Sequence, residues 1–98
     1  MTITYERSGG FAGMRKRALV DTATLAPAER AEWERLVDAA QFFRLPATIP
    51  PKNPQGRDMF IHVIRVERQG VRHEVRVTGT PDSEPLGALI GRLGALAH

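Results

Sequence analysis

The chain has 98 residues, 42% of them hydrophobic, which fits one domain with a single modest core over residues 1–98. It has no cysteine, so disulfides, thiolate metal sites and a cysteine nucleophile are excluded. Fourteen basic against eleven acidic residues give a net charge of +3, most of which comes from Arg15, Lys16 and Arg17. No apolar run approaches the roughly 20 residues of a membrane span, and no signal pattern opens the chain, so we expect a cytoplasmic protein.

The first segment predicts a β-hairpin. Residues 2–7 alternate β-branched or aromatic residues with polar ones, which is typical of a half-buried strand with Ile3 and Tyr5 facing inward. Residues 14–20 can return as a second strand. The loop between them, Ser8 to Gly13, is longer than a tight turn and has a conformation of its own.

This glycine-rich loop carries an unusual side chain. Three glycines, Gly9, Gly10 and Gly13, surround Phe11, and glycine is the residue used where φ is positive or another backbone approaches closely. The loop lacks the Lys-Ser/Thr ending and the strand-to-helix context of a phosphate-binding loop. Two readings of Phe11 stay open: its ring packs on the core, or it stands out as an anchor for a partner.

A helix is expected over residues 27–42, with Pro27 in its first turn and apolar residues at helical spacing, namely Trp33, Leu36, Val37 and Ala40. Residues 44–58 then contain four prolines, which remove backbone donors and disfavour helix. We interpret this segment as an extended loop. Structureless loops of about 15 residues are uncommon in small domains and are often functional.

Two further strands are predicted over residues 59–68 and 71–79, joined by Gln69-Gly70. A two-residue turn there places His62 opposite Val77 and creates two cross-strand pairs of opposite charge, Glu67 with Arg72 and Arg65 with Glu74. One face of this hairpin is then apolar and is expected to hold Phe60, Ile64, Val66, Val71, Val75 and Val77.

The last segment predicts a second helix. A turn and capping cluster over residues 80–85 precedes leucines and an isoleucine at helical spacing, while three glycines on the other side weaken the helix by about 1 kcal/mol each. The expected fold is therefore α+β, with the order ββαββα, and most simply a four-stranded antiparallel sheet with both helices packed on one face.

No catalytic or cofactor-binding constellation is recognisable. In the expected register His62 and His73 share a face, but four strand positions separate them, about 13 Å, which is too far for one metal ion. We therefore expect no enzyme activity, no cofactor and no metal, and interpret both histidines as packed beside a helix. Residues 14–17 are basic enough to suggest nucleic acid, but no interleaved aromatic residues or basic helix accompany them, so nucleic acid is the less favoured partner.

Several features in chain order resemble one family. They are Arg7-Ser8-Gly9-Gly10-Phe11-Ala12-Gly13, the helix ending Phe42-Phe43-x-Leu45-Pro46, Asp58-x-Phe60, His73-x-Val75 and the closing leucine helix. Together they resemble the emfourin family, small bacterial proteins that inhibit protealysin-like and thermolysin-like zinc metallopeptidases. The sequence differs from the family pattern at Phe60, where tyrosine is expected, and at Glu74, where threonine is familiar.

The resemblance implies a non-enzymatic protein that binds a zinc metallopeptidase and closes its active-site cleft. We expect it to act non-covalently and as a monomer. It also implies a target that prefers a bulky apolar side chain just after the scissile bond, which a preorganised Phe11 would supply. Our hypothesis for the contact surface comprises the glycine loop and part of the proline loop: Ser8, Gly9, Gly10, Phe11, Ala12, Gly13, Ile49 and Asp58. Two alternatives stay open: a small, possibly dimeric, interaction or scaffold domain, and a nucleic-acid-binding module.

Overall fold

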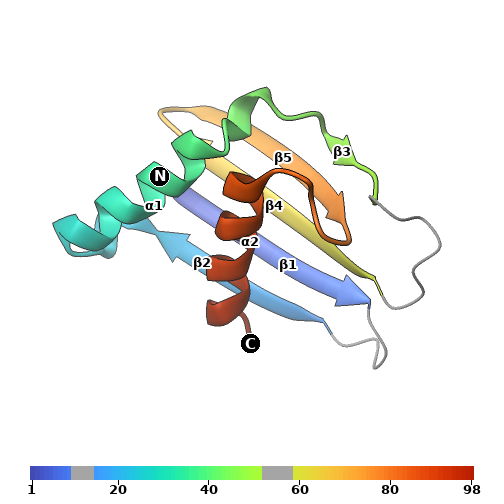
Figure 1. Ribbon diagram of the computed structural model, residues 1–98. Helices are drawn as coiled ribbons and strands as arrows, with labels where there is room; N and C mark the ends of the chain where they lie inside the picture. Colours follow the sequence, from blue (N-terminus) through green and yellow to red (C-terminus); the bar gives the residue numbers. More distant parts are fainter. Residues whose placement is uncertain (10–14, 52–58) are drawn as a thin grey trace.

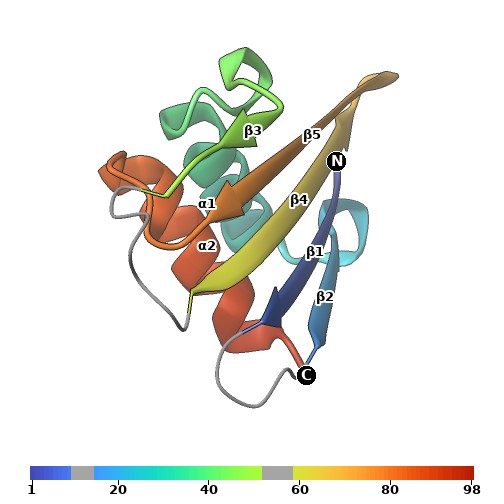
Figure 2. The same ribbon diagram turned by 90° about the vertical axis from the view of Figure 1, so that its right-hand side faces the viewer.

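A computed structural model describes residues 1–9, 15–51 and 59–98 of the chain, and these form two layers, a twisted sheet and two helices on one of its faces (Figures 1 and 2). The elements in chain order are β1 (Thr2–Gly9), β2 (Lys16–Asp21), a 3-10 helix (Thr22–Thr24), α1 (Pro27–Ala39), a 3-10 helix (Phe42–Arg44), β3 (Thr48–Ile49), β4 (Phe60–Arg68), β5 (Val71–Thr78) and α2 (Glu84–Leu96).

The strand order corrects one part of the sequence prediction. The sheet has five strands in the order β2-β1-β4-β5-β3 and is mixed, because the two-residue strand β3 runs parallel to β5, with Thr48 beside Arg76 and Ile49 beside Val77. The prediction of four antiparallel strands is therefore wrong in this detail. The α+β class with two helices over a sheet is confirmed.

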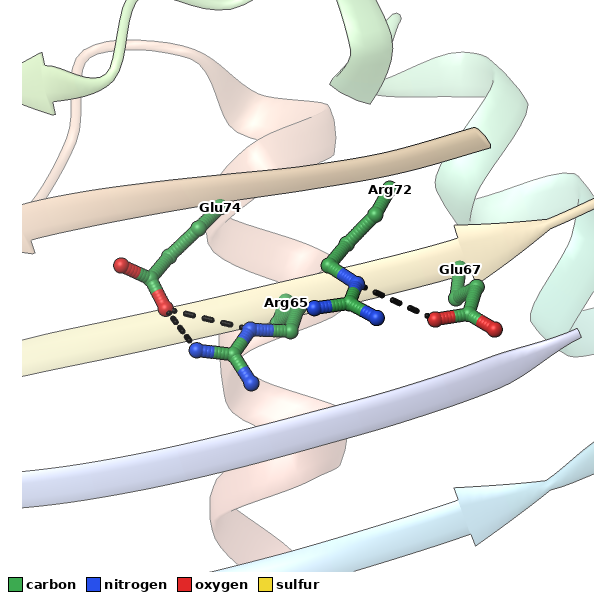
Figure 3. A network of polar contacts seen from close by, with 4 residues as sticks. All are labelled: Arg65, Glu67, Arg72 and Glu74. Carbon is green, nitrogen blue, oxygen red and sulfur yellow. Dashed lines mark hydrogen bonds and ion pairs between the residues drawn. The ribbon is translucent and has the colours of Figure 1, made fainter. Parts of the chain in front are cut away.

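The predicted register of the C-terminal hairpin is confirmed. Arg68 pairs with Val71 and Ile64 with Val75, without a bulge. Gln69 and Gly70 both have positive φ, 53° and 79°, as a two-residue turn of type I′ requires. The predicted ion pairs form on the face that the helices leave uncovered (Figure 3). The nitrogen-to-oxygen distance is 2.7 Å between Arg65 and Glu74 and 3.1 Å between Arg72 and Glu67.

The core lies between the sheet and the helices. Alternate residues of the strands point to the helix side, so a strand period of two selects which apolar residues are buried. The fully buried side chains come from both layers: Ile3, Tyr5, Ile64, Val66, Val75 and Val77 from the sheet, and Val37, Leu86, Leu89 and Leu93 from the helices. Phe60 and Val71, predicted on the same buried face, are instead 41% and 58% exposed. They stand at the first positions of β4 and β5, at the margin of the core.

Helix α1 is shorter than predicted. It ends at Ala39 and not at residue 42, because Gln41 takes a left-handed conformation with φ of 49° and the chain turns into the 3-10 helix Phe42–Arg44. Phe42 thereby packs into the core with 1% exposure, whereas Phe43 is only partly buried. The expected proline loop is also more ordered than predicted, since its first residues form this 3-10 helix and β3.

Helix α2 begins as its sequence predicts. The Ser83 side chain accepts a hydrogen bond from the Leu86 N–H at 3.3 Å, which caps one of the free donors of the first turn. The buried residues of α2 are Leu86, Leu89, Ile90 and Leu93. Of its glycines, Gly94 lies against Arg7 of β1, whereas a Cβ at Gly87 or Gly91 would meet no atom within 4 Å. Neither helix in the described part of the chain has the length and hydropathy needed to cross a membrane.

The exposed side of α2 gives a first testable prediction. A Cβ added at Gly91 meets no atom within 4 Å, so Gly91→Ala is expected to raise the free energy of unfolding by about 1 kcal/mol through helix propensity alone. Gly70→Ala is the contrasting control: its Cβ would also meet no atom within 4 Å, but a φ of +79° is one that other residues rarely adopt, so the substitution should lower the free energy of unfolding. Urea unfolding measures both changes. A loss of stability for Gly91→Ala, or a dimer in sedimentation that the substitution dissolves, would instead indicate that this face packs against another molecule.

Candidate functional site

One end of the sheet holds the described part of the predicted contact surface. The antiparallel pairing of β1 with β4 places Ser8 beside Ile61 and Gly9 beside Phe60. Ser8 and Gly9 are both half-buried. The other glycine-loop candidates, Gly10, Phe11, Ala12 and Gly13, lie outside the described residues, as does Asp58. Their role therefore stays a prediction.

Glycine is required at position 9. Its φ is +90°, a conformation that other residues rarely adopt, and a Cβ there would lie 2.9 Å from the carbonyl oxygen of Met59. The last residue of β1 therefore lies against the backbone that leads into β4. This close approach connects the start of the glycine loop to the end of the proline segment.

Gly79 lies at the same end of the sheet, beside Pro51 and Met59. A Cβ at Gly79 would meet Met59 Sδ at 3.2 Å and Pro51 Cβ at 3.7 Å, so the residues on either side of 52–58 both lie beside this glycine. Gly79 also donates a main-chain hydrogen bond to the Phe60 carbonyl at 2.8 Å. Figures 1 and 2 show that β1 and β3 finish, and β2 and β4 begin, at one end of the sheet.

Ile49, the remaining candidate, lies in β3 and not at the tip of a loop. Its side chain is partly buried and packs against the core. It therefore contributes to fixing the proline segment on the sheet. Its contact with a partner is untested and stays a prediction.

Sequence reasoning missed an exposed aromatic residue at this end. Phe60 was assigned to the buried hairpin face, but 41% of it is exposed, and the Arg7 guanidinium lies over its ring at 4.8 Å from the ring centre. A cation stacked on an aromatic ring contributes about 0.5–1 kcal/mol at an exposed site and orients both groups. The sequence signal for this exposure was that Phe60 is the first strand residue after the proline segment.

Beneath Phe60 lies a buried polar pair. The hydroxyl of Tyr5 is 2.7 Å from Nδ1 of His62, and the two rings stack with centroids 5.8 Å apart. Tyr5 is 2% exposed and His62 7% exposed. Since each buried polar atom needs a partner, this hydrogen bond permits both residues to lie in the core.

The charge of Arg7 acts on both members of this pair. Either the Tyr5 O–H donates to an unprotonated His62 Nδ1, or a protonated Nδ1 donates to the Tyr5 oxygen. Burial, opposed in part by Arg7, raises the pKa of Tyr5, so the phenol keeps its proton. Burial first, and the charge of Arg7 second, lower the pKa of His62.

The other sheet histidine, His73, has a separate environment. Its Nε2 is 2.7 Å from the Leu45 carbonyl oxygen, and its ring meets the edge of Phe42 at 5.6 Å. The interpretation of both histidines as residues packed in the sheet is confirmed. Within residues 1–9, 15–51 and 59–98, no three His, Asp or Glu side chains are grouped so that they could hold a metal ion.

The buried pair predicts a pH dependence of stability. Because the folded state lowers the pKa of His62, the unfolded chain binds a proton more readily below its ordinary pKa of about 6.5. The free energy of unfolding should therefore be at its full value above about pH 6.5 and fall as the pH decreases. Urea unfolding from about pH 7.5 to about pH 5 measures this. His62→Gln should flatten the decline, whereas His98→Gln, at an exposed position, should leave it unchanged. An identical decline in His62→Gln would assign the effect to other groups.

The chain matches one family of known proteins. The model of the emfourin family matches residues 5–94 of the chain, which includes both predicted contact segments and all but the first residues of β1 and the end of α2. No curated protein and no solved structure matches the chain.

Proposed function

Because the chain belongs to the emfourin family, a family of protease inhibitors, we propose that it inhibits a thermolysin-like or protealysin-like zinc metallopeptidase by closing the active-site cleft. The contact is non-covalent and is made by the end of the sheet where β1 finishes and β4 begins. We propose that the inhibitor acts as a monomer, one molecule to each peptidase.

The observation that carries this proposal is the convergence of two separate segments at one end of a compact frame. Gly9, which precedes the glycine loop, pairs with Phe60, while Pro51 and Met59, which flank residues 52–58, both lie beside Gly79. A cleft is a concave site, and a protein that fills it without being an extended peptide needs a narrow, projecting end. Two segments whose flanking residues lie at one end of a sheet are placed to reach one concave site together.

Rigid anchoring favours binding. An inhibitor gains affinity when its contact residues are ordered before the complex forms, because less conformational entropy is lost on association. Here the anchors are a sheet, two glycines in positive-φ conformations and a buried Tyr5–His62 hydrogen bond. Phe60 with Arg7 over its ring adds an exposed aromatic group of the kind that dominates many interfaces.

The experiment measures inhibition constants of single alanine variants against purified thermolysin and protealysin. Phe11→Ala and Phe60→Ala are each expected to weaken inhibition at least about tenfold, as the loss of an aromatic anchor does in other interfaces. Ile49→Ala and Asp58→Asn test the remaining candidates, and thermal unfolding separates lost contact from lost packing at Ile49.

Val71→Ala is the matched control, because Val71 is an exposed apolar residue beside the Gln69-Gly70 turn, at the opposite end of the sheet. It should inhibit like the parent protein. If the Phe11, Phe60, Ile49 and Asp58 variants all keep the parent inhibition constant while remaining folded, the contact surface lies elsewhere. If the parent inhibits neither peptidase, the proposed function is wrong for these two targets.

A further inference from the structure

The net charge of the protein is concentrated beside the proposed contact end. The end of β1 and the start of β2 bring together four cations, which we call the basic cluster: Arg7, Arg15, Lys16 and Arg17. Arg7 and Lys16 are direct cross-strand partners, and Glu6 and Arg17 are the next pair along. In sequence the cluster lies immediately before and after the glycine-loop candidates.

The rest of the chain is electrically balanced. Without the basic cluster and Glu6, the sequence retains ten basic and ten acidic residues, so the whole excess of +3 belongs to this cluster. Elsewhere on the open face of the sheet, Arg65 forms an ion pair with Glu74 and Arg72 with Glu67 (Figure 3).

The cations of the basic cluster outnumber their acidic partner. Glu6 is shared by two of them, with Arg15 Nε at 3.3 Å and Arg17 Nε at 3.2 Å, and the side chains of these arginines are still 61% and 68% exposed. On the helix side Arg7 lies against Gly94 and over the Phe60 ring. Like charges placed opposite each other on neighbouring strands destabilise a sheet. The fold alone therefore does not require this arrangement.

We propose that the basic cluster docks on an acidic rim of the target peptidase, beside the cleft that the adjacent loop enters. This inference rests on the proposed function and adds the chemistry of the partner surface: carboxylate groups facing Arg15, Lys16 and Arg17. A nucleic acid would also attract this charge. The peptidase is favoured because the cluster borders the proposed contact residues in the sequence and because Arg7 and Gly9 lie on the same strand.

The physical role of the basic cluster is to steer association. Opposite potentials on two surfaces raise the rate of encounter, and mutation of charges at the rim changes the association rate and its salt dependence more than the dissociation rate. At an ionic strength of about 0.15 M the screening length is about 8 Å, whereas at about 0.01 M it is about 30 Å. The contribution of the basic cluster should therefore be largest at low salt.

The test compares two double variants with equal changes of net charge. Arg15→Glu with Lys16→Glu reverses the cluster, and Arg44→Glu with Arg72→Glu makes the same change of charge at exposed positions away from it. Association and dissociation rates with purified thermolysin and protealysin are measured at about 0.01 M and about 0.15 M ionic strength. Circular dichroism confirms that both variants fold.

We expect the cluster reversal to lower the association rate about tenfold at low salt, with a smaller effect at higher salt and a nearly unchanged dissociation rate. The distant reversal should change the association rate much less. Equal effects of the two double variants overturn the inference and leave the proposed function intact, since the parent protein still inhibits. Salt-sensitive binding of a DNA duplex or single strand that the cluster reversal abolishes, with the peptidase rates unchanged, also overturns it. Absence of inhibition by the parent protein overturns both.

Discussion

The pairing of β1 with β4 joins two hairpins that are far apart in the sequence, and the remaining structure depends on it. All eight residues of β1 have a partner on β4, from Thr2 with Glu67 to Gly9 with Phe60. Without this ladder each hairpin would be a marginal two-stranded unit, whereas together they present one apolar face for both helices. The same ladder places the end of β1, which precedes Gly10, beside the start of β4, which follows Met59.

Arg7 connects the fold and the site. Its backbone continues the β1 ladder, while its guanidinium lies over the Phe60 ring and against Gly94. The positive charge lies near the C-terminal turn of α2, where the helix dipole is favourable to a cation. That contact and the Phe60 ring offset part of the repulsion between Arg7 and Lys16.

The features that the sequence predicted correctly depend on residues that are close together in the chain. Alternation within residues 2–7 identified Ile3 and Tyr5 as buried, and opposite charges across Gln69-Gly70 selected the hairpin register. These signals are local, so one sequence is enough to read them. The family resemblance, which rests on short motifs spread over the chain, was confirmed by a match over residues 5–94.

The errors concern features that depend on tertiary contacts. Helix α1 ends early because Gln41 turns the chain so that Phe42 enters the core. No glycine or proline in residues 28–42 marks this end in the sequence. Phe60 lies in phase with the buried apolar residues of β4, yet it stands at the margin of the core. The period of a strand does not show how far along the strand the helices cover it. The hydrogen bond of Tyr5 with His62 follows from the β1–β4 register, which no local pattern contained.

The strand that sequence reasoning missed has the largest consequence for the site. Two residues, Thr48 and Ile49, are too few for a pattern of alternation, and four prolines nearby argued for a loop. Their pairing with β5 is parallel, so both strands finish at the same end of the sheet, where Gly79 meets Pro51. Antiparallel pairing of β3 with β5 would have sent the chain to the opposite end, beside the Gln69-Gly70 turn. The direction of this short strand therefore places Pro51 at the end of the sheet that holds Gly9 and Phe60, and not beside the Gln69-Gly70 turn.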